Sequence, residues 1–239
     1  MNTDLEQLQQ YPFERLATLF TGLEPPKSLK NIPLSIGEPK HPPPEFVAHA
    51  IAASMDKISV YPNTKGALEL RQAIEVWLKD RFKLNCVDPE SQVLPVNGTR
   101  EALFSFAQAT IDRSDNPTIL MPNPFYQIYE GASILSGASI YFLNCDKETE
   151  YLTDFTSVPE KIWRSCQLIY ICSPGNPSGA VLSTSKMQEL IKLADKYDFI
   201  IASDECYSEI YYDEERPPPG LLEACSKMHR YNFKRCVAF

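Results

Sequence analysis

Helical and strand-like patterns alternate along most of this 239-residue chain, and this alternation strongly constrains its fold. Hydrophobic residues recur at helical spacing, and short apolar runs bounded by turn residues lie among these segments. The helical segments are 46–55, 70–82, 102–111 and 187–194, and the strand-like runs are 92–96, 118–121, 140–143, 167–172 and 199–203. Strands separated by helices predict an α/β fold with a mostly parallel sheet.

Composition narrows the class of partner. The chain is 44% hydrophobic and 23% charged, values typical of globular proteins, which disfavours both intrinsic disorder and a fibrous repeat. Its 23 Lys and Arg residues against 31 Asp and Glu residues give a net charge of −8. This balance disfavours nucleic acid and anionic membranes as partners, and it favours an enzyme that acts on small molecules.

Cysteine usage and the chain start both favour a cytoplasmic location. The seven cysteines form no Cys-x-x-Cys pair and no metal site with histidine, so we expect reduced thiols and no bound metal. Residues 1–6 lack the basic and apolar regions of a signal peptide. No apolar run approaches the roughly 18 residues of a membrane span.

Proline marks the organisation of the chain. The 20 prolines gather at 25–26, 42–44 and 217–219, and such runs favour extended backbone and stop helices. We therefore expect residues 1–45 to form an N-terminal arm with one short helix near 13–20. Residues 46–239 would form the main domain.

The candidate site follows the ends of the predicted strands. Ligands of open α/β sheets bind beyond the carboxyl ends of the strands. Polar and aromatic residues stand at four such ends, namely 98–100, 122–126, 173–179 and 204–207. We expect these four segments to line one crevice.

Gly98, Thr99 and Arg100 open a predicted helix, where free N–H groups and the helix dipole favour a phosphate. The alternative is a tight strand-to-helix turn at Gly98 with Thr99 as its cap. Dinucleotides and nucleoside triphosphates fit less well, since no Gly-x-Gly and no Gly-Lys-Ser/Thr occurs. A phosphorylated cofactor other than a dinucleotide remains.

Asp204 closes a predicted strand, where a partly buried carboxylate could hold a cationic ring nitrogen. A helix N-cap or a structural ion pair is the alternative. Tyr207 lies three residues further on and could face the same ligand, or it could be a core tyrosine.

Two further residues could contact a flat cofactor. Tyr126 could lay its ring over such a cofactor, although aromatic residues in this place are often core residues. Asn176 stands between Pro174 and Pro177, which would hold its amide in a stiff turn. A β-turn without any ligand is the alternative there.

Five motifs, taken in order, resemble the class I/II aminotransferases, which are pyridoxal-phosphate enzymes of fold type I. The motifs are residues 34–39, 61–66 with 69–71, 97–103, 176–179 and 203–207. The resemblance spans nearly the whole chain. It implies the large domain of fold type I, built on a mostly parallel sheet and incomplete at its C-terminus.

The resemblance implies roles around pyridoxal 5′-phosphate. Residues 98–100 would bind the phosphate, and Tyr126 would stack on the pyridine ring. Asn176 and Tyr207 would donate hydrogen bonds to the phenolic oxygen. Asp204 would keep the ring nitrogen protonated, so that the cofactor withdraws electrons from the substrate.

The resemblance also implies a homodimer and a substrate site. Tyr61 would reach the cofactor phosphate of the partner subunit, and Gly37 would lie beside the substrate carboxylate. Residues 1–45 would be the arm and part of a small domain, and 46–239 the cofactor-binding large domain.

Several segments look most like the bacterial N-succinyldiaminopimelate aminotransferase subfamily, namely 11–16, 35–43, 94–98, 122–131 and 173–176. Such enzymes transfer an amino group between glutamate and N-succinyl-2-amino-6-oxopimelate in lysine biosynthesis. Another class I/II aminotransferase (aspartate, alanine or aromatic) or a β-eliminating lyase is the first alternative. A non-catalytic dimerising remnant is the second.

The family's Schiff-base lysine has no counterpart in the chain. Only Lys227 and Lys234 follow Asp204, the first in a polar helical stretch and the second at the wrong end of the apolar run 236–239. That run ends without a cap or a polar tail, which predicts a truncation before the catalytic lysine. We expect the chain alone to be inactive.

Overall fold

The computed structural model describes residues 2–38 and 40–239, which separate into two units. The first unit contains the residues up to Gln9 together with Leu68–Phe239, and the second is Gln10–Ala67. Pro39, the last residue of the motif 34–39, lies outside the described residues. The predicted division of domains after residue 45 stays a prediction.

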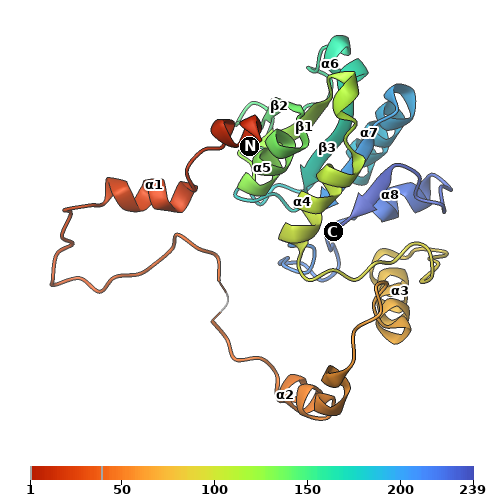
Figure 1. Ribbon diagram of the computed structural model, residues 1–239, viewed down its shortest axis with the longest axis horizontal. Helices are drawn as coiled ribbons and strands as arrows, with labels where there is room; N and C mark the ends of the chain where they lie inside the picture. Colours follow the sequence, from red (N-terminus) through yellow and green to blue (C-terminus); the bar gives the residue numbers. More distant parts are fainter. Residues whose placement is uncertain (1, 39) are drawn as a thin grey trace. The chain divides into compact units, whose positions relative to one another are not determined.

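The first unit alternates helices and strands, as the sequence predicts (Figure 1). Its strands are β1 Thr118–Asn123, β2 Ser139–Asn144, β3 Cys166–Cys172, β4 Ile200–Asp204 and β5 Cys236–Ala238. Its α-helices are α3 Leu68–Phe82, α4 Thr99–Thr110, α5 Gln127–Ser136, α6 Glu160–Ser165, α7 Thr184–Tyr197 and α8 Leu221–Lys227. Two short 3-10 helices, η1 Thr3–Gln7 and η3 Arg113–Asp115, complete it.

The five strands form one parallel sheet in the order β2-β1-β3-β4-β5. Successive side chains of a strand point to opposite faces. On β3, Leu168 and Tyr170 therefore pack with α4 and α5, whereas Ile169 and Ile171 pack with α7 and α8. At the central strand β3 both faces are largely buried, which explains why this strand is apolar along most of its length. The predicted α/β class is confirmed.

Local sequence explains where the helices begin and end. Ser183 caps α7 by accepting a hydrogen bond from the Lys186 backbone N–H, and Asp198 ends that helix in the left-handed conformation. Gly98 precedes α4 with φ 157° and ψ 149°, a backbone region that essentially only glycine adopts. The chain therefore turns abruptly into the helix.

The strand predicted at 92–96 is wrong. These residues form no strand, and the side chains of Leu94 and Val96 are exposed. An apolar run becomes a strand only when a neighbouring strand accepts its hydrogen bonds, and a groove of about 480 Å³ lies between this segment and β5. No described strand fills that groove.

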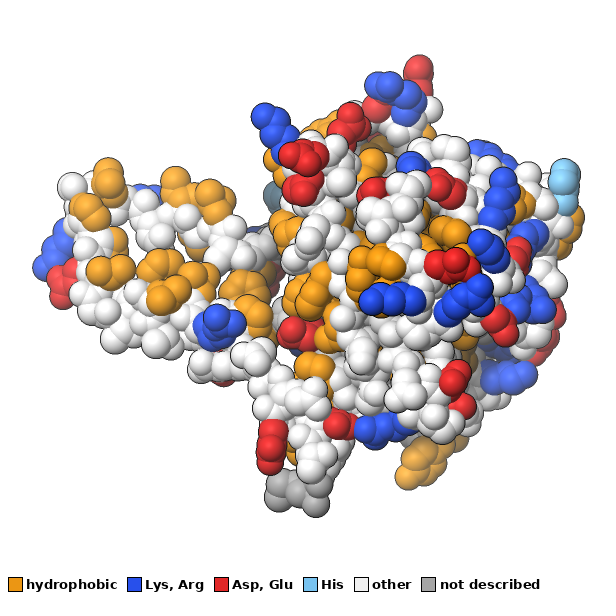
Figure 2. Space-filling model, turned by 90° about the horizontal axis from the view of Figure 1, so that it is seen from above, with side chains coloured by type: hydrophobic (Ala, Val, Ile, Leu, Met, Phe, Trp, Pro, Cys, Tyr) orange, Lys and Arg blue, Asp and Glu red, His pale blue; other side chains and the backbone are white. Residues whose placement is uncertain are grey.

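The second unit contains α1 Pro12–Leu19, α2 Glu45–Ala52 and the 3-10 helix η2 Met55–Ser59, and its other described residues form no helix or strand. The short helix predicted near 13–20 is confirmed. Neither α1 nor α2 contains a buried residue. Hydrophobic side chains stay on the surface, where Figure 2 draws them in orange. Among the described helices, none is both long and apolar enough to cross a membrane.

Candidate functional site

The carboxyl ends of β3 and β4 place the candidate residues side by side. Cys172 and Asp204 are register partners at these two ends, and the segments 173–179 and 204–207 continue from them. All strands are parallel, so the turns that follow them meet at one edge of the sheet.

Asp204 is the buried charge of this edge, with only 5% of its surface exposed. Its Oδ2 accepts a hydrogen bond from the Tyr129 hydroxyl at 2.6 Å, and its Oδ1 accepts a longer one from the Cys206 backbone N–H at 3.4 Å. Among the described residues it forms no ion pair and caps no helix. Both alternatives for Asp204 are therefore wrong, and the carboxylate keeps capacity to accept a further donor.

Asn176 and Tyr207 meet above this edge. The Asn176 Nδ2 donates to the Tyr207 hydroxyl at 3.3 Å. Backbone hydrogen bonds from Gly175 to Ala180 and from Gly179 to Gly175 hold the loop that carries Asn176. Burial raises the pKa of the Tyr207 phenol, so this hydroxyl stays protonated at neutral pH. The loop is therefore a tight turn. This turn also places the side-chain amide of Asn176 against Tyr207, a second candidate residue.

The start of α4 joins the same group. Thr99 lies beside the turn after β4, with 3.2 Å between its Oγ1 and the Cys206 Sγ. The Arg100 Nε donates to the Tyr126 hydroxyl at 2.8 Å. The N-terminus of α4 and the Arg100 guanidinium therefore lie at the same sheet edge as Asp204. This edge has positively charged groups as well as a carboxylate.

Tyr126 and Phe125 behave differently, although both are partly buried against the core. Phe125 stacks on Phe142 with ring centroids 5.3 Å apart. Tyr126 directs its hydroxyl to Arg100 and places its ring edge-on to Tyr129. Phe125 is thus a packing residue, and Tyr126 is part of the candidate site.

Sequence reasoning missed Tyr129. This buried residue of α5 donates to Asp204 and stacks on Tyr170, with centroids 4.6 Å apart and planes at 10°. The stretch 122–131 contains Tyr126 and Tyr129 three residues apart, a spacing that puts both on one side of a helix start. This spacing is the feature of the sequence that indicates Tyr129 as a neighbour of the candidate site.

Two thiols also flank Asp204. Burial raises the pKa of both Cys172 and Cys206 to about 11, and the nearby Asp204 carboxylate adds to each shift. Both are therefore neutral thiols at physiological pH. Across the described chain, no group of three or more His, Cys, Asp or Glu side chains could hold a metal ion.

The two lysines that the sequence analysis rejected as the Schiff-base lysine lie away from this group, and two predicted site residues belong to the second unit. Lys227 ends α8 and pairs with Glu223, and Lys234 precedes β5 at the amino edge of the sheet. Tyr61 and Gly37 belong to the second unit. Their predicted roles stay predictions.

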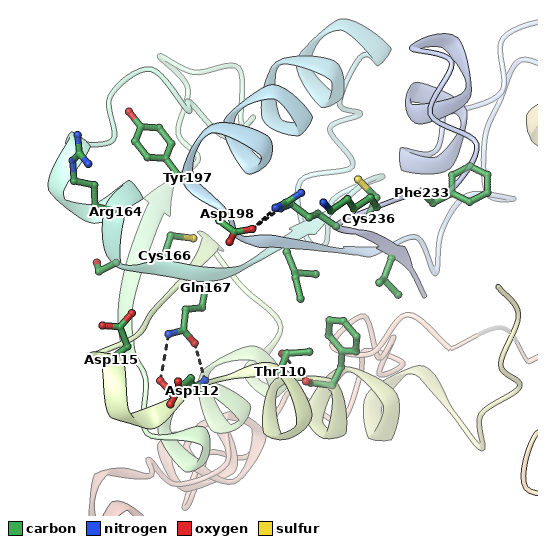
Figure 3. A pocket seen from close by; sticks show the side chains of 16 residues that line it. Thr110, Asp112, Asp115, Arg164, Cys166, Gln167, Tyr197, Asp198, Phe233 and Cys236 are labelled. Carbon is green, nitrogen blue, oxygen red and sulfur yellow. Dashed lines mark hydrogen bonds and ion pairs between the residues drawn. The ribbon is translucent and has the colours of Figure 1, made fainter. Parts of the chain in front are cut away.

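The cavity in Figure 3 lies at the opposite, amino edge of the sheet. It measures about 640 Å³ and is lined by Cys166 and Cys236, the first residues of β3 and β5. Some of its polar side chains already have partners within the lining, because Gln167 exchanges hydrogen bonds with the Asp112 backbone and Arg235 pairs with Asp198. None of the predicted cofactor-binding residues lines it.

Comparison with known proteins gives the family. Residues 30–233 match the family of class I and II aminotransferases. The chain is 31% identical over 222 residues to an LL-diaminopimelate aminotransferase of Nitratidesulfovibrio vulgaris, covering 88% of this chain and 56% of that protein. The corresponding enzyme of Aquifex aeolicus is also 31% identical, with 83% and 52% covered. The chain thus spans about half the length of these curated relatives.

Solved structures agree in fold. An aminotransferase from Neisseria meningitidis is 46% identical with a TM-score of 0.94, over 100% of this chain and 60% of that one. The aminotransferase AspB from Helicobacter pylori is 38% identical with a TM-score of 0.89, over 97% and 59%. The predicted family and the predicted fold type I domain are confirmed. This chain belongs to the class I and II aminotransferases.

Proposed function

We propose that this chain is the cofactor-binding part of a pyridoxal-phosphate-dependent aminotransferase. The observation that carries the proposal is the convergence of Asp204, Asn176, Tyr207 and the start of α4 at one sheet edge. The donors and acceptors of this edge match the three polar parts of the cofactor. The buried carboxylate suits a protonated ring nitrogen, the helix N-terminus suits the phosphate, and the amide–phenol pair suits the phenolic oxygen.

Each residue would have a separate task. Asp204 would hold the ring nitrogen in its protonated form, and Thr99 and Arg100 would bind the phosphate together with the Gly98 backbone. Tyr126 would cover one face of the ring. The cofactor supplies the electron withdrawal that acidifies the substrate carbon bearing the amino group. The protein binds and orients it.

We propose glutamate and a diaminopimelate-type acceptor as the substrates of the whole protein. Relatives named LL-diaminopimelate aminotransferase support this substrate class. The finer proposal is the succinylated form, N-succinyl-2-amino-6-oxopimelate, in the lysine pathway of the cytoplasm. Glutamate-dependent amination of this succinylated acceptor, but not of the unsuccinylated one, would support it. A preference for the unsuccinylated acceptor would instead make that compound the proposed substrate.

We propose a homodimer whose interface includes the second unit. A region of this kind cannot be stable through burial of its own side chains, because these are exposed. A second copy of the chain would cover them and bring Tyr61 to the partner's site. The exposed hydrophobic side chains of this unit include Leu19, Phe20, Leu23, Leu29, Ile32, Leu34, Phe46 and Ile51.

The test is a titration of the 239-residue chain with pyridoxal phosphate, followed by borohydride reduction and peptide mass mapping. We expect reversible binding without a reduced lysine adduct, since Lys227 and Lys234 lie away from Asp204. Asp204→Asn should weaken binding about tenfold or more, because a charged hydrogen bond is worth about 1.5–3 kcal/mol.

Asp213→Asn, which changes a partly exposed carboxylate that pairs with Arg216, is the matched control and should bind as the unmodified chain does. Absence of binding would refute the cofactor site. A single adduct on Lys227 or Lys234 would instead refute the expectation that the chain alone is inactive.

A further inference from the structure

We propose that Tyr129 is a positioning residue for Asp204, which makes the site selective for a ligand with a protonated ring nitrogen. The inference rests on the proposed function, and it assigns a role to a side chain that would not touch the ligand itself. It starts from a juxtaposition: a buried phenol donates its proton to one oxygen of the buried carboxylate.

The contact is short and enclosed. The Tyr129 hydroxyl lies 2.6 Å from Asp204 Oδ2, and both residues are buried. Hydrogen bonds from hydroxyl to carboxylate of this length are the charge-assisted kind. Burial raises the pKa of the Tyr129 phenol strongly, and the Asp204 charge adds to the shift, so the proton stays on the phenol. Tyr129 is thus a permanent donor.

The ring of Tyr129 is held in place by its neighbours. Tyr170 stacks on one face, and Tyr126 meets the ring edge-on with centroids 5.9 Å apart. A donor on a fixed ring also fixes the oxygen that accepts from it.

This fixed donor has two consequences for the carboxylate. It occupies Oδ2, so Oδ1, whose described partner is the 3.4 Å contact from Cys206, is the oxygen with most capacity for a ligand. It also fixes the orientation of the carboxylate, because a short hydrogen bond holds the oxygen that accepts it. A cationic ring N–H is the donor that gains most from such an acceptor.

The test compares two ligands of the 239-residue chain: pyridoxal phosphate and the analogue in which carbon replaces the ring nitrogen. The measured quantity is the ratio of their dissociation constants. We expect the unmodified chain to prefer pyridoxal phosphate and Tyr129→Phe to reduce that preference by roughly tenfold, the usual effect of a hydrogen bond to a charged group.

Tyr170→Phe is the matched control, since it removes another buried phenol hydroxyl from the same stack. It should leave the ratio within about twofold, because its hydroxyl contacts the Leu103 carbonyl and not Asp204. A purely structural role for Tyr129 would weaken both ligands equally in Tyr129→Phe. An unchanged ratio there would overturn the inference.

Asp204→Asn separates this inference from the proposed function. If Asp204→Asn abolishes the preference and Tyr129→Phe does not, only the role of Tyr129 is refuted. If the unmodified chain binds neither ligand, both proposals fail.

If Tyr129→Phe does not fold, 3-fluorotyrosine at position 129 replaces it as the probe. This side chain keeps the shape and donates a more acidic proton. It should retain the preference for pyridoxal phosphate in full, and a loss of that preference would count against the proposal.

Discussion

The sheet unit and the arm-like second unit have similarly hydrophobic sequences, but the first buries its hydrophobic side chains and the second leaves them exposed. In the sheet unit, strands bury their apolar side chains on both faces between helices. In Gln10–Ala67, equally large side chains such as Leu34 and Phe46 remain exposed. The difference shows that hydrophobic periodicity predicts a helix, whereas burial requires a second surface to pack against. The sheet provides that surface within one chain.

An Ile→Ala substitution should lower the free energy of unfolding far more in the sheet unit than in the second unit, and this is the largest difference that we expect. Ile169→Ala on β3 should lower the free energy of unfolding by about 2–5 kcal/mol, because it opens a cavity in a fully buried core. Ile32→Ala removes the same atoms from an exposed side chain and should change it by less than about 0.5 kcal/mol. Urea denaturation of the dissociated chain measures both. Equal losses would contradict the comparison.

A buried carboxylate should give the sheet unit its own pH dependence. Glu205 accepts hydrogen bonds from Ser203 and from the Leu221 backbone, and burial raises its pKa from 4.5 to about 7. Between these values the folded chain holds a proton that the unfolded chain has released. The free energy of unfolding should therefore fall as pH rises from about 4.5 to about 7, on the order of 3 kcal/mol.

Glu205→Gln mimics the protonated carboxyl and should remove this part of the pH dependence. Glu24→Gln in the exposed second unit should leave the pH dependence of unfolding as it is. Denaturation at a series of pH values distinguishes the two variants. If the two variants have the same profile, Glu205 is not the group responsible.

Two fully exposed tyrosines test the proposed interface. Tyr61 lies in the second unit and Tyr212 in the sheet unit. Tyr61→Ala should weaken the homodimer by about tenfold, or ~1.4 kcal/mol, because an aromatic residue buried at an interface contributes strongly. Tyr212→Ala should leave the dimer unchanged. Sedimentation equilibrium gives the dissociation constants of both variants. If the unmodified chain is monomeric, the proposed homodimer is wrong.

Substitutions at the helix N-caps should give the smallest difference in unfolding free energy between the two units. Ser183 caps α7 with its side chain, whereas Tyr11 makes no side-chain hydrogen bond at the start of α1. Ser183→Ala should cost about 1 kcal/mol of unfolding free energy, and Tyr11→Ala should cost less. Thermal unfolding followed by circular dichroism measures both. A larger loss for Tyr11→Ala would mean that α1 packs against a partner.

Most elements were predictable because their periodicity is local. The strands near 118–121, 140–143, 167–172 and 199–203 form as predicted, since each run is apolar throughout and bounded by turn residues. The run 92–96 has the same appearance and forms no strand. Pairing is a property of two segments, so no single run can reveal it.

The sequence by itself determined the α/β class, the family, and the sheet edge where Asn176, Asp204 and Tyr207 gather, because ordered motifs and parallel topology specify these. Only the tertiary structure decided that Asp204 is held by Tyr129, which precedes it by 75 positions, and that Thr99 lies beside Cys206. Hydrogen bonds between distant residues depend on packing of the helices against the sheet. Local periodicity contains no information about that packing.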